Sequence, residues 1–168
     1  MTVHPLVTQL RFARSEFRRC FEGVEEAEAR QRLQPMNCLS WIVGHLANQE
    51  QRCWLIFSQG QTLYPNLNDL VGFGKPASTP PLDEMWSVWQ EITQAADAYL
   101  DTLTPQALLA YQNRDGKPLP ENTGTLLMRN IYHYFYHTGE ASAIRQILGH
   151  KNLPIYIGEM EEVQYRPE

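Results

Sequence analysis

Four stretches of this chain repeat apolar residues every three or four positions, and this periodicity constrains the fold more than any other feature. We expect helices over about residues 5–28, 37–58, 79–103 and 122–148. Each helix would have an apolar stripe too narrow to fold alone, and packing four of them together buries all the stripes at once. The pattern therefore predicts an all-α protein, a four-helix bundle.

Residues that favour helix ends flank these stretches. Asn37 and Thr79 are suited to the N-cap position, and Pro80 to the first position of a helix. Gly60 and Gly149 are expected to end the second and fourth helices, because glycine readily takes the left-handed conformation found there.

The connections between the expected helices differ in length. The short first connection predicts that helices one and two are antiparallel neighbours. The second, about residues 59–79, is long enough to be a crossover between helices 2 and 3. The third is a short irregular insert before helix 4, with one helical turn near residues 104–109 and a tight turn or hairpin at Asp115-Gly116. We expect residues 59–79 and 112–121 to form the walls of any pocket.

Length and charge limit the possible classes of protein. A chain of 168 residues predicts a single domain over residues 1–168, with a core at about 5–150 and a C-terminal tail at 151–168. The 14 Lys and Arg against 19 Asp and Glu give a net charge of −5, which argues against a nucleic-acid partner bound by a generally basic surface.

Other sequence features bear on the cellular setting. No apolar run approaches the roughly 18–20 residues that cross a bilayer, so no membrane is expected. The N-terminal residues lack the pattern of a signal peptide. Cys20, Cys38 and Cys53 are odd in number and form no Cys-x-x-Cys pair, which favours a reducing, cytoplasmic setting over a disulfide scaffold.

The fourth expected helix carries a pair of histidines with metal-ligand spacing. His133 and His137 are four residues apart, so both imidazoles project from adjacent turns of one face and can chelate one divalent ion. Asn130 and Glu140 lie on the same line and could orient ligands from outside the metal's own shell. Position 134 is Tyr, which removes the general base of a His-Glu-x-x-His metalloprotease.

A third ligand would come from His45 on the second expected helix, beside Gly44, which permits close approach of other atoms. Simpler interpretations remain open for these residues. The histidines can be hydrogen-bonded core residues or partly exposed ones, and Glu140 can form an ordinary salt bridge. His4 and His150 are expected at the surface. The aromatic face of Tyr132, Phe135 and Tyr136 is expected to turn away from the histidines.

Two sequence motifs together resemble a known family. The motifs are Ser40-Trp41-Ile42-Val43-Gly44-His45-Leu46-Ala47 and His133-x-x-x-His137-x-Gly139-Glu140. This combination resembles the DinB-like (DinB/YfiT) proteins over about residues 5–150. The resemblance implies that His45, His133 and His137 bind a divalent metal ion, with zinc or nickel first and iron or manganese next.

The resemblance also implies a chemistry. Characterised relatives transfer low-molecular-weight thiols or isomerise thiol adducts, so we expect a small-molecule thiol substrate and a metal-dependent S-transferase. A related hydrolase would use a metal-activated water instead, and relatives suggest a homodimer. The alternative is a non-catalytic, stress-associated bundle whose metal is structural or whose surface binds a protein partner. A bundle without metal is a third interpretation.

Overall fold

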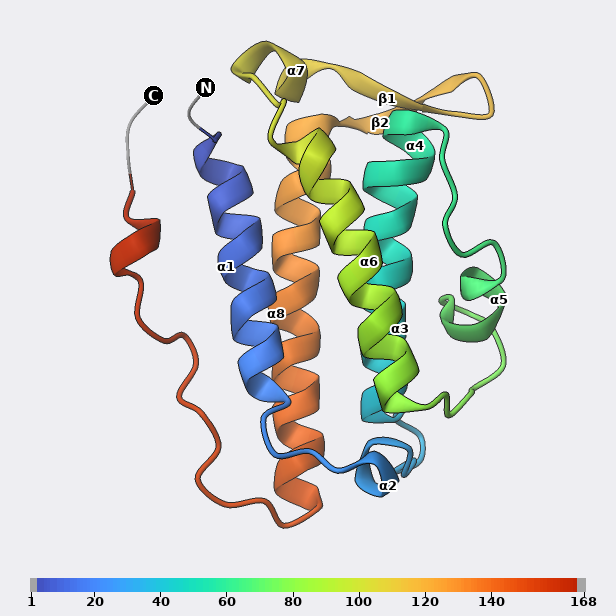
Figure 1. Cartoon of the computed structure of the whole chain (residues 1–168), viewed down its shortest axis with the longest axis vertical. Helices are drawn as coiled ribbons and strands as arrows, with labels where there is room; N and C mark the ends of the chain where they lie inside the picture. Colours follow the sequence, from blue (N-terminus) through green and yellow to red (C-terminus); the bar gives the residue numbers. More distant parts are fainter. Residues whose placement is uncertain (1–2, 166–168) are drawn as a thin grey trace.

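The computed structural model describes residues 3–165 of the chain, and four long helical segments lie side by side within it (Figure 1). They are α1 (Pro5–Cys20), α3 (Leu39–Glu50), α6 (Leu82–Leu100) and α8 (Thr123–Ile147). The rod that starts as α3 continues through a π-helical turn, η1 (Gln51–Ile56), into α4 (Phe57–Gln59). The described chain is therefore mostly helical, as the sequence predicts.

The four segments run in two directions. In Figure 1, α1 and α8 run downwards whereas α3 and α6 run upwards. The most extensive backbone contacts join α1 to α8 and α3 to α6, and a lesser contact joins α3 to α8. The predicted neighbour relation of the first two helices is therefore wrong, although they are antiparallel. The connection through α2 (Glu26–Ala29) crosses the end of the molecule and places α3 away from α1 (Figure 1).

Apolar side chains from all four segments meet in one core. The largest fully buried ones include Phe17, Ile42, Trp54, Ile92, Leu127 and Ile144. A buried polar network crosses the same core. Both Arg14 and Tyr134 donate hydrogen bonds to the Glu50 carboxylate, at 2.7 and 2.9 Å. Arg14 also reaches Asp97, at 2.6 Å, and the indole N–H of Trp89 donates to the Tyr134 hydroxyl at 2.8 Å.

Helix ends confirm some cap predictions and correct others. Gly60 and Gly149 adopt φ values of +67° and +90°, as expected for glycines that end helices. The predicted first helix is too long, because α1 ends at Cys20 and the chain turns at Gly23, where φ is +77°. A separate short helix, α2, then follows.

The N-caps of two helices also differ from the prediction. Cys38 rather than Asn37 precedes α3, and Pro81 rather than Thr79 precedes α6. Neither observed cap residue accepts a capping hydrogen bond with its side chain from the amides of the helix. By contrast, Asn122 caps α8, since its side chain accepts a hydrogen bond from the Thr125 amide at 2.9 Å.

The connections contain short elements. The crossover carries α5 (Leu67–Val71), and the insert before α8 carries α7 (Pro105–Leu109) and a hairpin of β1 (Tyr111–Arg114) and β2 (Lys117–Asn122). Its turn has positive φ at Asp115 and Gly116, the pattern of a type I′ turn. The fold is broadly all-α, as predicted, with this small antiparallel sheet added, and the predicted tight turn or hairpin is confirmed.

The C-terminal tail runs back along α1 (Figure 1). Gln9 donates to the carbonyl of Val163 at 2.8 Å, and Val163 is the last residue of the short η2 (Glu161–Val163). Further along α1, Glu16 accepts from the Gly158 amide and Arg19 donates to the Ile155 carbonyl. The tail is therefore held against α1 by hydrogen bonds at three positions along the helix.

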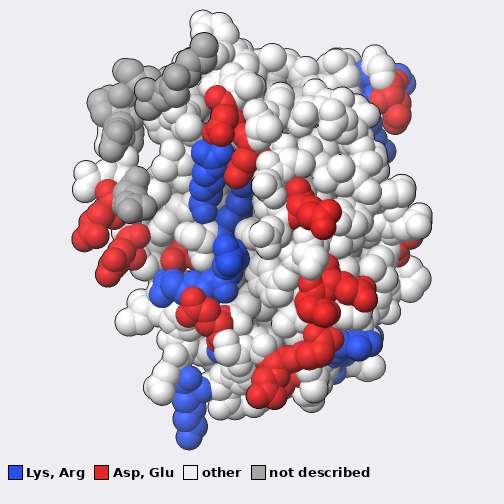
Figure 2. Space-filling view, in the orientation of Figure 1, with Lys and Arg blue, Asp and Glu red and all other residues white. Residues whose placement is uncertain are grey.

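Charges of both signs adjoin on the face that bears α1 (Figure 2). A column of basic side chains follows α1, which contains Arg11, Arg14, Arg18 and Arg19. Arg11 pairs with Asp101 at 2.7 Å and Arg19 with Glu16 at 2.8 Å. Within residues 3–165, no helix is long and apolar enough to span a membrane.

Candidate metal centre

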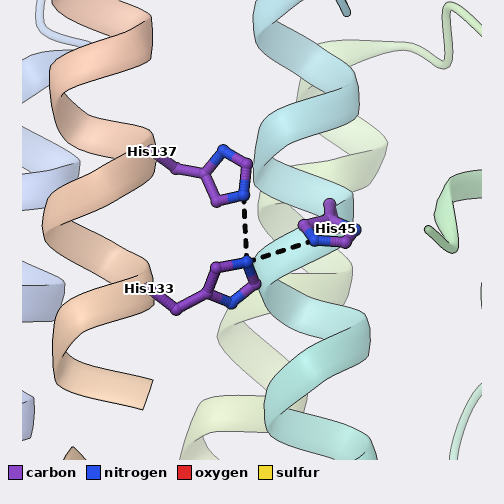
Figure 3. Close-up of side chains that lie close together, drawn as sticks. All are labelled: His45, His133 and His137. Atoms are coloured by element: carbon purple, nitrogen blue, oxygen red, sulfur yellow. Dashed lines mark hydrogen bonds between the residues drawn. The ribbon is translucent and has the colours of Figure 1, made fainter. Parts of the chain in front are cut away.

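Three histidines from two helices converge on one point (Figure 3). His45 projects from α3, and His133 and His137 project from adjacent turns of α8. The Nε2 atom of His133 lies 3.3 Å from Nε2 of His45 and 3.0 Å from Nε2 of His137. One ligand atom from each of the three rings lies within 4.8 Å of the other two.

His45 is held in place by the crossover and by a tryptophan. Its Nδ1 lies 2.9 Å from the carbonyl oxygen of Val71, so the Nδ1–H donates to that oxygen and the Nε2 lone pair faces the other histidines. The Trp41 ring stacks on the imidazole, with centroids 4.5 Å apart. Val71 can come this close because residue 44 is glycine, and a β-carbon there would lie 3.1 Å from Val71 Cγ1.

His137 is oriented by an acid one turn away. Its Nδ1 lies 2.7 Å from Oε2 of Glu140, so this nitrogen carries the proton and Nε2 faces the site. Asn130, the other residue expected to orient a ligand, forms no hydrogen bond to a histidine among the described residues. Its amide donates to the Leu126 carbonyl at 2.8 Å, within the same helix. Glu140 therefore has the geometry predicted for such a role, and Asn130 does not.

Burial keeps two of the rings neutral. Removal from water lowers the pKa of His45 to about 4, with the neighbouring His137 adding to the effect. Burial, followed by the closeness of His137 and His45, lowers the pKa of His133 to about 3. Neutral imidazole is the form that ligates metal ions, so both rings are ready to bind at neutral pH.

The geometry and the donor set fit a divalent ion. Two nitrogens that are each about 2.1 Å from one ion lie about 3.0 Å apart at a right angle and about 3.4 Å apart at a tetrahedral angle. The observed separations of 3.0 and 3.3 Å match this range. Three imidazoles leave further coordination positions for a substrate, as in reactive rather than purely structural sites.

A cavity of about 650 Å³ opens onto His45 and His133. Its walls come mainly from α3, η1 and α8, with Phe73 contributed by the crossover. The expectation that both long connections would form the walls is thus only partly right, because residues 112–121 line a smaller neighbouring cavity instead. This size suits a small organic molecule.

Several sequence interpretations of single residues are corrected here. Tyr132 and Tyr136 line the cavity rather than facing away, and the Tyr136 ring lies 5.1 Å from the His137 ring. His4 is buried and caps α1 by accepting from the Leu6 amide. His150 bonds to Arg145 at 3.0 Å and to Glu28 at 3.2 Å, so it joins the end of α8 to α2.

Sequence reasoning missed four groups at the site: Trp41, the Val71 carbonyl, Arg52 and Phe73. The stacking of Trp41 on His45 has a visible signal, since residues four apart share a helix face. Val71 and Phe73 belong to the crossover, whose path no periodicity predicts. Arg52 lies on the π-helical turn, where the ordinary helical spacing no longer indicates which way a residue faces.

Comparison with known proteins identifies the family. The family model described as Mycothiol-S-transferase matches residues 5–149, which is most of the chain. No curated protein gives a significant match. The match covers every helix that carries a site histidine and agrees with the DinB-like resemblance of the two motifs. The chain therefore belongs to the mycothiol S-transferase family of DinB-like proteins.

Proposed function

We propose that this protein is a metal-dependent thiol S-transferase in which His45, His133 and His137 bind one divalent ion. The observation that carries the proposal is the convergence of three Nε2 atoms beside a substrate-sized cavity, which His45 and His133 line. The family's name supplies the reaction class, and mycothiol or a similar low-molecular-weight thiol is the proposed co-substrate.

The chain's own residues would prepare the site. The Val71 carbonyl and the Glu140 carboxylate hold the Nδ1–H groups of His45 and His137, so both Nε2 lone pairs point inward without reorganisation. When bound, a divalent ion would lower the pKa of a coordinated thiol so that thiolate predominates at neutral pH. The cavity gives the thiol and a second substrate access from the side of His45 and His133.

The proposed reaction is a displacement at an electrophilic carbon. The thiol loses its proton to solvent through the open cavity, and its sulfur forms a bond to that carbon. The leaving group departs with the electron pair of the bond that breaks. The products are a thioether and the released group, so the reaction needs no oxidant or reductant.

Three imidazole ligands do not select one divalent metal. On the family resemblance we propose zinc or nickel, with iron and manganese as further possibilities. Protein purified without chelators should contain about one equivalent of metal, as expected for one three-histidine site. His137→Ala should lose most of it, whereas His150→Ala should keep it. Because His150 joins α8 to α2, its replacement tests whether lowered stability alone releases metal. Equal metal loss in both variants would contradict the assigned ligands.

Turnover tests the enzyme function separately. Mycothiol, bacillithiol, glutathione and coenzyme A would each be incubated with a chromogenic electrophile and the metal-loaded protein. Metal-dependent thioether formation with one of them is the expected result. No turnover with any thiol, together with a large gain in melting temperature on metal binding, would favour the alternative of a structural metal in a non-catalytic protein.

The remaining proposals concern the molecule as a whole. We propose that residues 1–168 form one four-helix-bundle domain, since α1, α3, α6 and α8 share a single buried core. Cys20, Cys38 and Cys53 are buried free thiols, which supports our proposal of a reducing, cytoplasmic setting.

A further inference from the structure

An arginine without an acidic partner lies in the wall of the histidine cavity. Arg52 is half-buried on η1, and its guanidinium lies 5.8 Å from the centre of the Phe57 ring. Among the residues that the structure describes, no side chain forms a hydrogen bond or ion pair with it. A half-buried cation that faces a cavity and lacks a counter-charge is a binding group for an anion.

A second cavity extends this part of the wall. It has a volume of about 260 Å³ and shares Gln49, Arg52 and Arg129 with the first cavity. Its far side includes Arg114, from the hairpin. We call Arg52, Arg114 and Arg129 the arginine cluster.

The arginine cluster carries excess positive charge. Within the described chain, the charged side chains that line the two cavities are these three arginines and one carboxylate, Glu121, so the balance is 3 − 1 = +2. Glu121 is already engaged by Arg129, whose Nε donates to it at 2.8 Å. The only acid within ion-pair distance of Arg114 among the described residues is the exposed Asp115, at 3.7 Å, a contact that water weakens.

The arginines lie on one side of the histidines. Because α3 and α8 are antiparallel, Arg52, seven residues after His45, and Arg129, four before His133, are both displaced towards the hairpin (Figure 1). At about 1.5 Å of rise per residue, these offsets are about 10 and 6 Å. An extended small molecule can therefore have its reacting atom at the histidines and a charged group at the arginines.

We propose that the arginine cluster binds an anionic group, a carboxylate or a phosphate, of a substrate that reacts at the histidine site. The proposal rests on the proposed function for the reaction and adds the substrate class, an anionic small molecule with its charge about 6–10 Å from the reacting atom. Arg52 is the main specificity residue, since Arg129 already shares its charge with Glu121.

Binding of simple anions tests the cluster without any turnover. Succinate, inorganic phosphate and the neutral succinamide would be titrated into the full chain, with and without metal. Nitrogen NMR of the arginine side chains and calorimetry would report binding. We expect one of the two anions to bind with a dissociation constant of about 1–10 mM, as suits a few charge-assisted hydrogen bonds, and to shift the Arg52 signal. Succinamide should not bind.

Variants make the test specific. Arg52→Gln should weaken anion binding at least about fivefold, and Arg52→Lys should weaken it less, because lysine keeps the charge but loses the bidentate geometry. Arg18→Gln, which removes an exposed arginine from α1, is the matched control and should change nothing. Circular dichroism would verify that each variant is folded.

Each outcome decides the proposal. Tighter binding of succinate indicates a carboxylate substrate, and tighter binding of phosphate indicates a phosphorylated one. Equal binding by Arg52→Gln and the parent protein, binding of succinamide, or binding only in the metal-loaded form would overturn the cluster as an anion site. Anion binding in a protein without thiol turnover would reject the proposed function and leave the anion site standing.

Discussion

At the scale of single residues, the site depends on where the protons of two imidazoles are held. His45 and His137 both donate from Nδ1 to a fixed oxygen, one on the backbone of the crossover and one on Glu140. These hydrogen bonds select one tautomer and one ring orientation. The oxygens thus matter for metal affinity although they do not touch the ion.

Replacing Glu140 tests this role. Glu140→Ala should weaken metal binding about 10–100-fold, because the His137 ring loses both its orienting partner and a negative charge beside it. Glu140→Gln should have a smaller effect, since its amide oxygen can still accept from Nδ1. A titration against a competing chelator would measure both affinities. Unchanged affinity in Glu140→Ala would mean that the carboxylate forms only an ordinary salt bridge.

The site residues differ in how far the sequence predicts them. The spacing of His133 and His137 predicts their shared face directly, because both lie on one regular helix. His45 lies 88 positions from His133. The sequence offers it as a third ligand on another helix, and the family resemblance supports that choice, but no local spacing places it beside the pair. Asn130 shares the same line of α8, yet its amide turns back to the helix backbone, a choice that spacing cannot reveal.

At the scale of secondary-structure elements, the crossover is part of the site because α5 packs closely on α3. The packing depends on Gly44, where a β-carbon would overlap the sulfur of Met85 and press on Val71. The carbonyl of the same Val71 holds His45. A larger residue at position 44 would therefore displace Val71 on α5, and with it the carbonyl that holds His45 on α3.

Gly44→Ala should reduce the free energy of unfolding by about 1–3 kcal/mol through overpacking, and it should also weaken metal binding. Gly139→Ala is the matched control, because residue 139 is helical, exposed and has no atom within 4 Å of the added carbon. That variant should gain about 0.5–1 kcal/mol from its better helix propensity. Urea unfolding and a metal titration would measure both; a Gly44→Ala protein as stable as Gly139→Ala would contradict the packing argument.

Element boundaries are predictable only where local chemistry decides them. Asn122 and Gly149 bound α8 through a side-chain cap and a left-handed glycine. The sequence predicts Gly149 as the end of this helix and a start at about residue 122. The break after Cys20 was not, since the apolar spacing continues to Val24 although the chain must turn there to reach α3. Tertiary geometry overrides local periodicity at that point.

At the scale of the whole molecule, the buried polar network joins all four long helices. Arg14 comes from α1, Glu50 from α3, Trp89 and Asp97 from α6, and Tyr134 from α8. Tyr134 follows His133 on α8, so the network and the histidine site share one turn of that helix. Charges buried in this way fix how helices are placed relative to one another when all their hydrogen bonds are made.

Glu50→Gln should lower the free energy of unfolding by about 3–5 kcal/mol, because it leaves Arg14 buried with only Asp97 to balance it. Asp69→Asn is the control, since it removes an exposed partner of Lys75, and it should cost less than about 1 kcal/mol. Chemical denaturation would measure both values. A loss below 1 kcal/mol in Glu50→Gln would show that the network adds little to stability.

The three histidines span the boundary between the two most closely associated helix pairs, α1 with α8 and α3 with α6. A bound ion would therefore link the α1–α8 pair to the α3–α6 pair, which contact each other less extensively through α3 and α8. The same metal–ligand bonds would then serve the reaction and hold the two helix pairs together. The spacing of α3 and α8, and with it the width of the cavity that a substrate enters, would then depend on the metal–ligand bonds as well as on side-chain packing.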